Sequence, residues 1–87
     1  MTGKLPNVHP GEILWEDFME PHGLTKRGLA DAIGVPATRI GEITRGRRGI
    51  TADTDLRLSR YFGTTEGYWL RLQNVFDLEE ARRYMVA

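Results

Sequence analysis

Glycines and prolines divide this 87-residue chain into five short segments in which apolar residues recur at the three- and four-residue spacing of an α-helix. Breaks fall at Gly23, Gly34, Gly46 and Gly63, and no segment shows a convincing two-residue alternation typical of a strand. We therefore expect an all-α protein with five helices in one domain. A chain of this length buries only a small core, so a homodimer is also expected.

The expected domain covers residues 9–78. Residues 1–8 are predicted to form a flexible N-terminal arm, because glycine, proline and asparagine interrupt any helical pattern there. Residues 79–87 are predicted to be a charged C-terminal tail. Helix starts are indicated by capping residues or by proline in the first turn, at His9-Pro10, Thr25, Pro36, Thr51 and Thr64 or Thr65.

Composition narrows the class of protein further. The chain has no cysteine, which excludes disulfides and thiolate metal sites and suits a reducing compartment. It has no apolar run long enough to span a membrane and no secretion leader, so we expect a cytoplasmic protein. His9 and His22 have no suitably spaced partners, so no metal site is predicted. No cofactor is expected, and no nucleophile, carboxylate pair or phosphate loop suggests an enzyme.

Charge is distributed unevenly although the net charge is zero. Residues 26–60 hold eight basic and four acidic side chains, a net charge of +4, and the remainder holds four basic and eight acidic ones, a net charge of −4. A basic patch of this kind favours a nucleic-acid partner for one side of the molecule.

Residues 25–46 carry the most informative pattern, which is two short helices joined by a turn that contains Gly34. This arrangement is typical of a helix-turn-helix, whose second helix enters the major groove of DNA. With Ile40 and Ile43 on the core side, the opposite face of the second helix is predicted to meet the bases, and small residues at Ala37 and Gly41 allow close approach. The predicted base-reading residues are Ala37, Thr38, Arg39 and Glu42.

Two of these residues have ordinary alternatives. Thr38 either contacts DNA or is a solvated helix residue. Arg39 either reads a guanine through its guanidinium fork or forms a surface pair with Glu42, three residues later, and both hold if Glu42 orients Arg39. Glu42 repels phosphate, so its direct contact with DNA is limited to accepting a hydrogen bond from cytosine.

Basic residues surround the predicted recognition helix. They either form solvated surface or contact DNA phosphates, and their clustering next to one helix-turn-helix favours phosphate contacts. The predicted phosphate-binding residues are Lys26, Arg27, Arg45, Arg47 and Arg48.

The sequence also resembles HigA-type (VapI-like) antitoxins of the Xre/Cro-like, lambda-repressor-like helix-turn-helix DNA-binding proteins. The resemblance rests on His9-Pro-Gly-Glu-Ile-Leu, Leu29-Ala-Asp-Ala-Ile-Gly-Val-Pro, Arg39-Ile-Gly-Glu-Ile, Gly46-Arg-Arg-Gly-Ile-Thr-Ala-Asp-Thr, Arg57-Leu-Ser-Arg-Tyr-Phe-Gly-Thr-Thr and Tyr68-Trp-Leu-Arg-Leu-Gln. It implies a dimeric repressor that binds double-stranded DNA at its own operator and neutralises a HigB-type ribonuclease toxin. Many relatives have glutamine where this chain has Lys26, which shifts that position toward phosphate contact.

Two further surfaces are predicted. If the toxin is basic, the acidic face of the first helix is its candidate docking surface, although such a face also serves solubility. The candidate toxin-binding residues are Glu12, Glu16, Asp17 and Glu20. Apolar residues cover more than one stripe of the last helix, so part of this set is expected to form the dimer interface. The candidate interface residues are Tyr68, Trp69, Leu72, Val75 and Phe76. The alternative functions are an orphan Xre-family regulator and a protein-interaction module without DNA binding.

Overall fold

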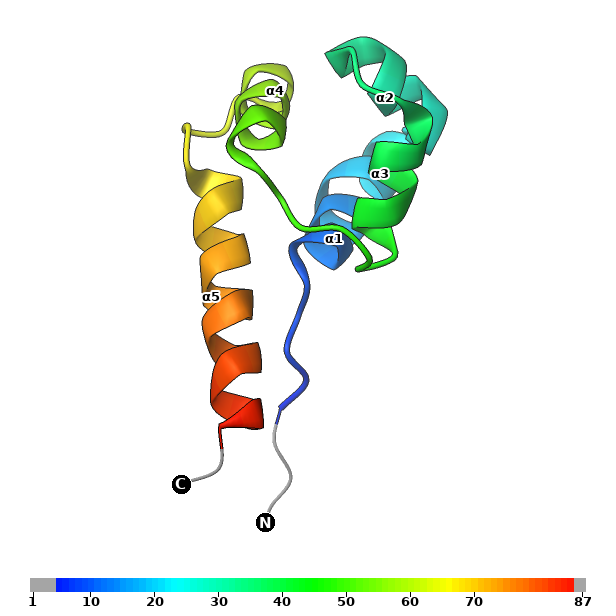
Figure 1. Ribbon diagram of the computed structural model, residues 1–87. Helices are drawn as coiled ribbons and strands as arrows, with labels where there is room; N and C mark the ends of the chain where they lie inside the picture. The colour runs from blue at the N-terminus through cyan, green and yellow to red at the C-terminus, as the bar shows by residue number, and fades with distance from the viewer. Residues whose placement is uncertain (1–4, 86–87) are drawn as a thin grey trace.

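The computed structural model describes residues 5–85, and over that range helices are joined by short turns (Figure 1). The α-helices are α1 (Pro10–Ile13), α2 (Lys26–Ile33), α3 (Ala37–Thr44), α4 (Ala52–Phe62) and α5 (Tyr68–Tyr84). Between α1 and α2 the chain continues as a π-helix, η1 (Leu14–Met19), and a 3-10 turn, η2 (Glu20–His22). The prediction of an all-α protein with five helices is confirmed.

Local capping sets most of the helix ends, as expected. The hydroxyls of Thr25 and Thr51 accept hydrogen bonds from backbone N–H groups in the first turns of α2 and α4. Pro36 precedes α3 as its N-cap and is not its first helical residue. The predicted start of α5 at Thr64 or Thr65 was wrong, because both residues lie in the loop and the helix begins after Gly67.

The π-helical segment changes which side chains of the first helix are buried. In η1 the turns widen from the usual spacing, and the N–H of Glu20 bonds to the carbonyl of Trp15, five residues earlier. This spacing places Leu14 and Met19, which are also five residues apart, together in the core with no exposed surface. Phe18, which a regular α-helix would place one turn from Leu14 on the same face, is only partly buried.

A close approach of α1 to α3 holds the N-terminal helix against the helix-turn-helix. A Cβ atom on Gly11 would lie 1.8 Å from the carbonyl oxygen of Ile43, so only glycine fits at this contact. The core lies behind this crossing and is formed by buried apolar residues from η1, α2, α3, α4, α5 and the intervening segments: Leu14, Met19, Leu29, Ala30, Ile33, Val35, Ile40, Ile43, Ile50, Leu58 and Trp69.

The second half of α5 projects beyond the other helices, and residues 5–8 run alongside it (Figure 1). Asn7 Nδ2 donates to the carbonyl of Phe76 at 3.0 Å and to Glu80 Oε2 at 2.9 Å. Residues 79–84, which were predicted to belong to a charged tail, continue α5. Residues 1–4 of the predicted arm and residues 86–87 of the predicted tail lie outside the described residues.

Candidate nucleic-acid interface

The turn between α2 and α3 has the geometry of a helix-turn-helix. Gly34 ends α2 in the left-handed conformation, with a φ of 77°, where other residues would be strained. The N–H groups of Gly34 and Val35 both bond to the carbonyl of Ala30. Since Ile33 and Val35 are buried, this turn is anchored to the core, and it presents the start of α3 at the surface.

Three of the four residues that were expected to meet the bases lie in the first turn of α3, and the fourth, Glu42, lies further along the helix and is half-buried. Ala37 and Thr38 are exposed, Arg39 is half-buried, and Ile40 and Ile43 on the opposite side have no exposed surface. The predicted orientation of this helix is therefore confirmed.

The sequence suggested that Gly41 lets the surface of α3 approach DNA closely. The structure shows otherwise. Gly41 is buried, and a Cβ atom there would lie 3.3 Å from Nη1 of Arg45. The space left by the missing side chain is occupied by the Arg45 guanidinium, so Gly41 shapes the position of an arginine and does not open the helix to base edges.

The alternative in which Arg39 pairs with Glu42 is not observed, because each side chain has another partner. Arg39 Nη1 donates to Asp53 Oδ2 at 2.8 Å, and Glu42 Oε1 accepts from Arg48 Nε at 2.8 Å. The three-residue rule considers only neighbours on one helix, whereas the turn after α3 brings the start of α4 to Arg39 and the loop residue Arg48 to Glu42.

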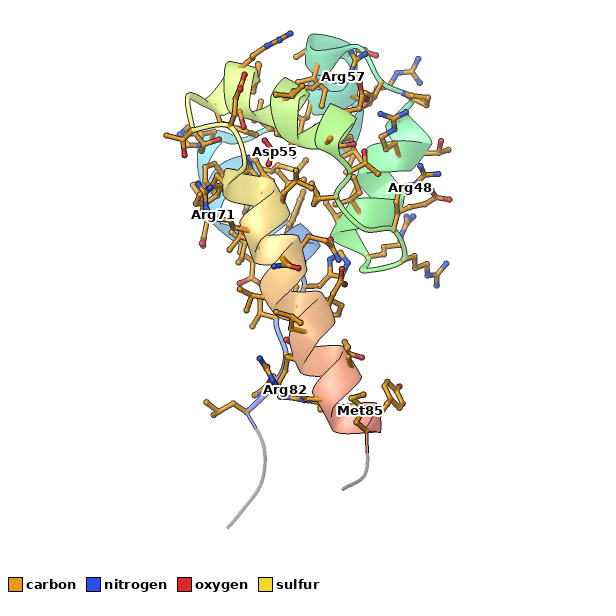
Figure 2. The ribbon with its side chains drawn as sticks, turned by 60° about the vertical axis from the view of Figure 1, so that its left-hand side comes forward. Arg48, Asp55, Arg57, Arg71, Arg82 and Met85 are labelled. Carbon is orange, nitrogen blue, oxygen red and sulfur yellow. The ribbon has the colours of Figure 1, made fainter. Side chains whose placement is uncertain are left out.

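The predicted phosphate-binding residues lie in two places, at the start of α2 and at the C-terminal end of α3 with the loop that follows it. Arg27, Arg45, Arg47 and Arg48 are exposed, and Lys26 is half-buried with its ammonium 5.8 Å from the centre of the Trp15 ring. Figure 2 shows Arg48 and Arg57 on the outside of the helical body. For the predicted residues, contact with phosphates stays a prediction.

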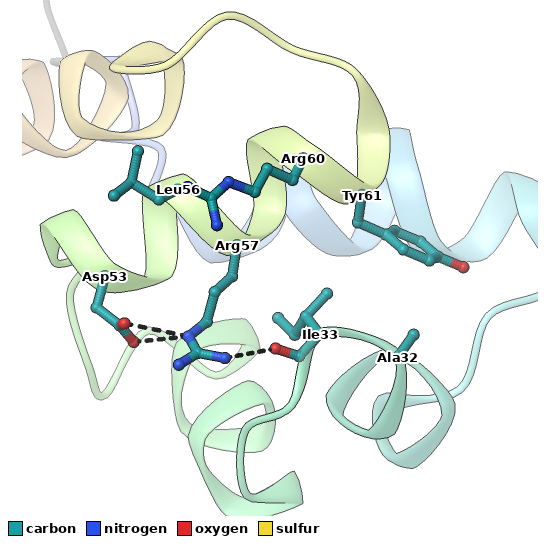
Figure 3. A pocket seen from close by; sticks show the side chains of 7 residues that line it. All are labelled: Ala32, Ile33, Asp53, Leu56, Arg57, Arg60 and Tyr61. Atoms are coloured by element: carbon teal, nitrogen blue, oxygen red, sulfur yellow. Dashed lines mark hydrogen bonds and ion pairs between the residues drawn. The ribbon is translucent and has the colours of Figure 1, made fainter.

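Asp53 and Arg57 were not predicted as site residues. Nε of Arg57 donates to both carboxylate oxygens of Asp53, at 3.1 and 3.0 Å, and Nη1 donates to the carbonyl of Ile33 at 2.8 Å (Figure 3). Hydrogen bonds from Arg57 and from Arg39 hold the pKa of Asp53 below its ordinary value. The four-residue spacing of Asp53 and Arg57 was the only sequence signal for this group.

The two histidines have structural roles. His9 is buried, its Nδ1 accepts from the N–H of Gly11 at 2.9 Å to cap α1, and its ring packs edge-on against Phe76. Burial lowers the pKa of His9, in spite of the opposing charges of Asp77 and Glu12. His22 donates from Nδ1 to the carbonyl of Phe18 at 2.8 Å. Within residues 5–85 no three His, Cys, Asp or Glu side chains gather as metal ligands would.

The acidic candidates lie on the surface of the first helical segments. The four side chains are all exposed, as expected, and are contributed by α1, η1 and η2 in turn: Glu12, Glu16, Asp17 and Glu20.

The candidate interface residues of α5 do not share one surface. Trp69 has no exposed surface and belongs to the core, and Tyr68, Leu72 and Phe76 are half-buried against the body. Of that set only Val75 is largely exposed, at 65%. Three other exposed apolar residues at this end of the molecule were not predicted, namely Leu78 and Tyr84 of α5 and Met85, which follows the helix. Among the described helices, none is long and apolar enough to cross a membrane.

Comparison with known proteins supports the resemblance noted in the sequence. A helix-turn-helix family model matches residues 16–69. Virulence-associated protein I of Dichelobacter nodosus is 50% identical over 80 residues, which cover 92% of this chain and 74% of that protein. Antitoxin HigA-1 of Vibrio cholerae is 35% identical over 75 residues, which cover 86% of this chain and 70% of that protein.

A solved structure gives the same result. The structure of Pseudomonas aeruginosa antitoxin HigA with the higBA promoter superposes with a TM-score of 0.87 and 38% identity, over 90% of this chain and 85% of that one. The names of these relatives describe antitoxins and a virulence-associated protein, and not enzymes. The chain belongs to the helix-turn-helix family of HigA-type antitoxins.

Proposed function

We propose that this protein is the antitoxin and autorepressor of a toxin–antitoxin operon, and that it binds the operator of its own gene through α3. The observation that supports this most strongly is the exposed first turn of α3, together with three exposed arginines at the other end of the helix and in the following loop, Arg45, Arg47 and Arg48. A helix of this kind fits the major groove, where a base edge meets Thr38 or Arg39 and those exposed arginines meet phosphates. The solved HigA relative was captured with its promoter.

The test is a binding titration with the promoter region upstream of the gene and with a scrambled duplex of the same length. We expect tighter binding to the promoter and a steep fall of both affinities with salt, because phosphate contacts release counterions. Equal affinity for the two duplexes would contradict the proposal, and a negligible salt dependence would favour the protein-interaction module.

Dimerisation is proposed through the projecting half of α5. Val75 and Leu78 are exposed apolar residues of α5 three residues apart, so they form one stripe on the helix, and the exposed Met85 follows directly after the helix end. A two-fold pairing of this stripe would allow two copies of α3 to lie about 34 Å apart, in successive major grooves. We expect a dimer by light scattering, a monomer for Leu78→Asp, and an unchanged dimer for Tyr61→Asp, which alters an exposed apolar residue of α4.

We propose that the acidic surface, formed by the exposed acids of α1, η1 and η2, binds and neutralises the toxin. A HigB-type ribonuclease that carries a basic surface would be attracted to the acidic surface. We expect the product of the neighbouring reading frame to copurify with the protein, and reversal of Glu16 and Asp17 to lysine to weaken that association. Reversal of Glu66, an exposed acid before α5, serves as the control. Unchanged association after reversal of the acidic surface would place the toxin elsewhere.

Both proposed partners are expected in the cytoplasm. If the neighbouring frame encodes no toxin and no partner copurifies, the operator-binding activity would stand alone, as in an orphan Xre-family regulator.

A further inference from the structure

Asp53, in the first turn of α4, is bound by two arginines that come from different helices. Its Oδ2 accepts from Arg39 Nη1 at 2.8 Å, and both of its oxygens accept from Arg57 Nε at 3.1 and 3.0 Å. Arg39 belongs to α3, whereas Asp53 and Arg57 belong to α4. The carboxylate therefore links the predicted recognition helix to the helix that follows it.

Arg57 is fixed in turn by the helix-turn-helix itself. Its Nη1 donates to the carbonyl of Ile33, at the end of α2, at 2.8 Å (Figure 3). The same nitrogen donates to the carbonyl of Gly34 at 3.4 Å. A Cβ atom on Gly34 would lie only 3.2 Å from the same nitrogen, so the turn leaves just enough room for the guanidinium. Asp53 is thereby held by an arginine that spans from α4 to the turn before α3.

Among the described residues, the pair leaves Nε and Nη2 of the Arg39 guanidinium without a hydrogen-bond partner, and 28% of this side chain is exposed. Arginine has five N–H donors in a planar fork, and among the described residues Asp53 occupies only the Nη1 corner. The edge formed by Nε and Nη2 suffices for two parallel hydrogen bonds to O6 and N7 of a guanine. A side chain that is already held in one orientation loses less conformational entropy when it binds.

We propose that Asp53 is a positioning residue for DNA recognition, which holds the Arg39 guanidinium in the orientation that reads a guanine. The inference rests on the proposed operator binding and adds a residue that determines specificity through another side chain. Charge alone predicts a different result, because removing a carboxylate from a DNA-binding surface strengthens binding to any duplex.

The experiment is a double-mutant cycle of Asp53→Asn and Arg39→Ala, with affinity for the promoter fragment and for the scrambled duplex measured at one salt concentration. Loss of a bidentate arginine–guanine contact lowers the ratio of the two affinities by about 5- to 150-fold. We expect Asp53→Asn to lower this ratio by about three- to tenfold, a fraction of that range, while affinity for the scrambled duplex stays constant or rises. In the Arg39→Ala background, Asp53→Asn should have no further effect on the ratio.

Asp31→Asn is the matched control, since Asp31 is an exposed carboxylate of α2 in the same basic stretch. It removes one negative charge, so any change in affinity should be equal for the two duplexes. Circular dichroism of each variant verifies that the helices are intact, which separates a loss of positioning from a loss of folding.

Several results would overturn the inference. An unchanged ratio for Asp53→Asn would show that Arg39 needs no positioning, and a raised ratio would show that Asp53 restrains it. An equal loss in the Arg39→Ala background would show that Asp53 acts on the fold. These outcomes all require a wild-type preference for the promoter, whereas equal wild-type affinity for both duplexes would remove the proposed function and the inference together.

Discussion

The two faces of α4 carry aspartates of the same chemistry in opposite surroundings. On the inner face, Asp55 is 1% exposed, and its carboxylate accepts from the N–H groups of Gly67 and Leu70 and from the hydroxyl of Ser59, at 2.9, 2.8 and 3.0 Å. On the outer face, the Asp53 side chain is 54% exposed, and its hydrogen-bond partners are the arginine side chains of Arg39 and Arg57. Figure 2 shows Asp55 where α4 meets the start of α5.

The difference separates stability from recognition. The inner carboxylate satisfies backbone donors that are buried with it, so its loss leaves unpaired groups in the core. Exposed ion pairs contribute little to stability, because water and salt screen them. The outer face can therefore use charge to position side chains for a ligand at little cost to the fold.

The largest effect is expected for Asp55→Ala. This change leaves the N–H groups of Gly67 and Leu70 without their acceptor, so the free energy of unfolding should fall by about 3 kcal/mol. Denaturant unfolding followed by circular dichroism, at one protein concentration, measures it. A loss below about 1 kcal/mol would mean that the inner face is not the stabilising one.

Acid should weaken the same inner contact. Burial alone would raise the pKa of Asp55, but hydrogen bonds from Gly67, Leu70 and Ser59 outweigh it and hold the pKa below its ordinary value. Since the unfolded chain then binds the proton more tightly, this contribution is complete above about pH 4 and is lost as the pH falls further. Unfolding measured across this range should show a shallower acid dependence for Asp55→Asn, and parallel curves would contradict the assignment.

An intermediate effect is expected for Arg57→Ala, on the outer face. The change removes the donor to the carbonyls of Ile33 and Gly34, so we expect a loss of about 1 kcal/mol, reduced by the partial exposure of the side chain. The promoter-to-scrambled affinity ratio should fall as well, because Asp53 loses its anchor. If stability falls and the ratio does not, Arg57 supports the turn alone.

The smallest effect on folding is expected for Asp53→Asn. The unfolding midpoint should remain that of the wild-type protein, because both ion pairs of Asp53 are solvent-exposed. Denaturant unfolding followed by circular dichroism, as for Asp55→Ala, measures this midpoint. A shift as large as that of Arg57→Ala would erase the distinction between the two faces.

Local signals in the sequence predicted the helix-turn-helix well. Thr25 and Thr51 mark helix starts, and Gly34 and Gly63 mark helix ends, through interactions that reach only a few residues along the chain. The spacing of Ile40 and Ile43, which lie one helical turn apart, was sufficient to predict that the start of α3 is exposed on the opposite side.

Tertiary contacts determined the features that the sequence did not predict. The start of α5 is fixed by Gly67, whose N–H bonds to Asp55, twelve residues earlier. The partner of Arg39, Asp53, comes from a different helix, so helical spacing could not predict this ion pair. Trp69 is covered by Phe18 from η1, so helical spacing could not predict its burial either. The widened turns of η1 have no recognised sequence signal.

The most direct test of DNA reading by α3 is a set of promoter duplexes in which single guanines are replaced by 7-deazaguanine, which lacks the N7 acceptor. Binding of the wild-type protein and of Arg39→Ala is measured for each duplex. We predict one guanine in each half-site at which the replacement weakens wild-type binding and leaves the affinity of Arg39→Ala unchanged. If no guanine shows this dependence on Arg39, the assignment of Arg39 as the guanine-reading residue is wrong.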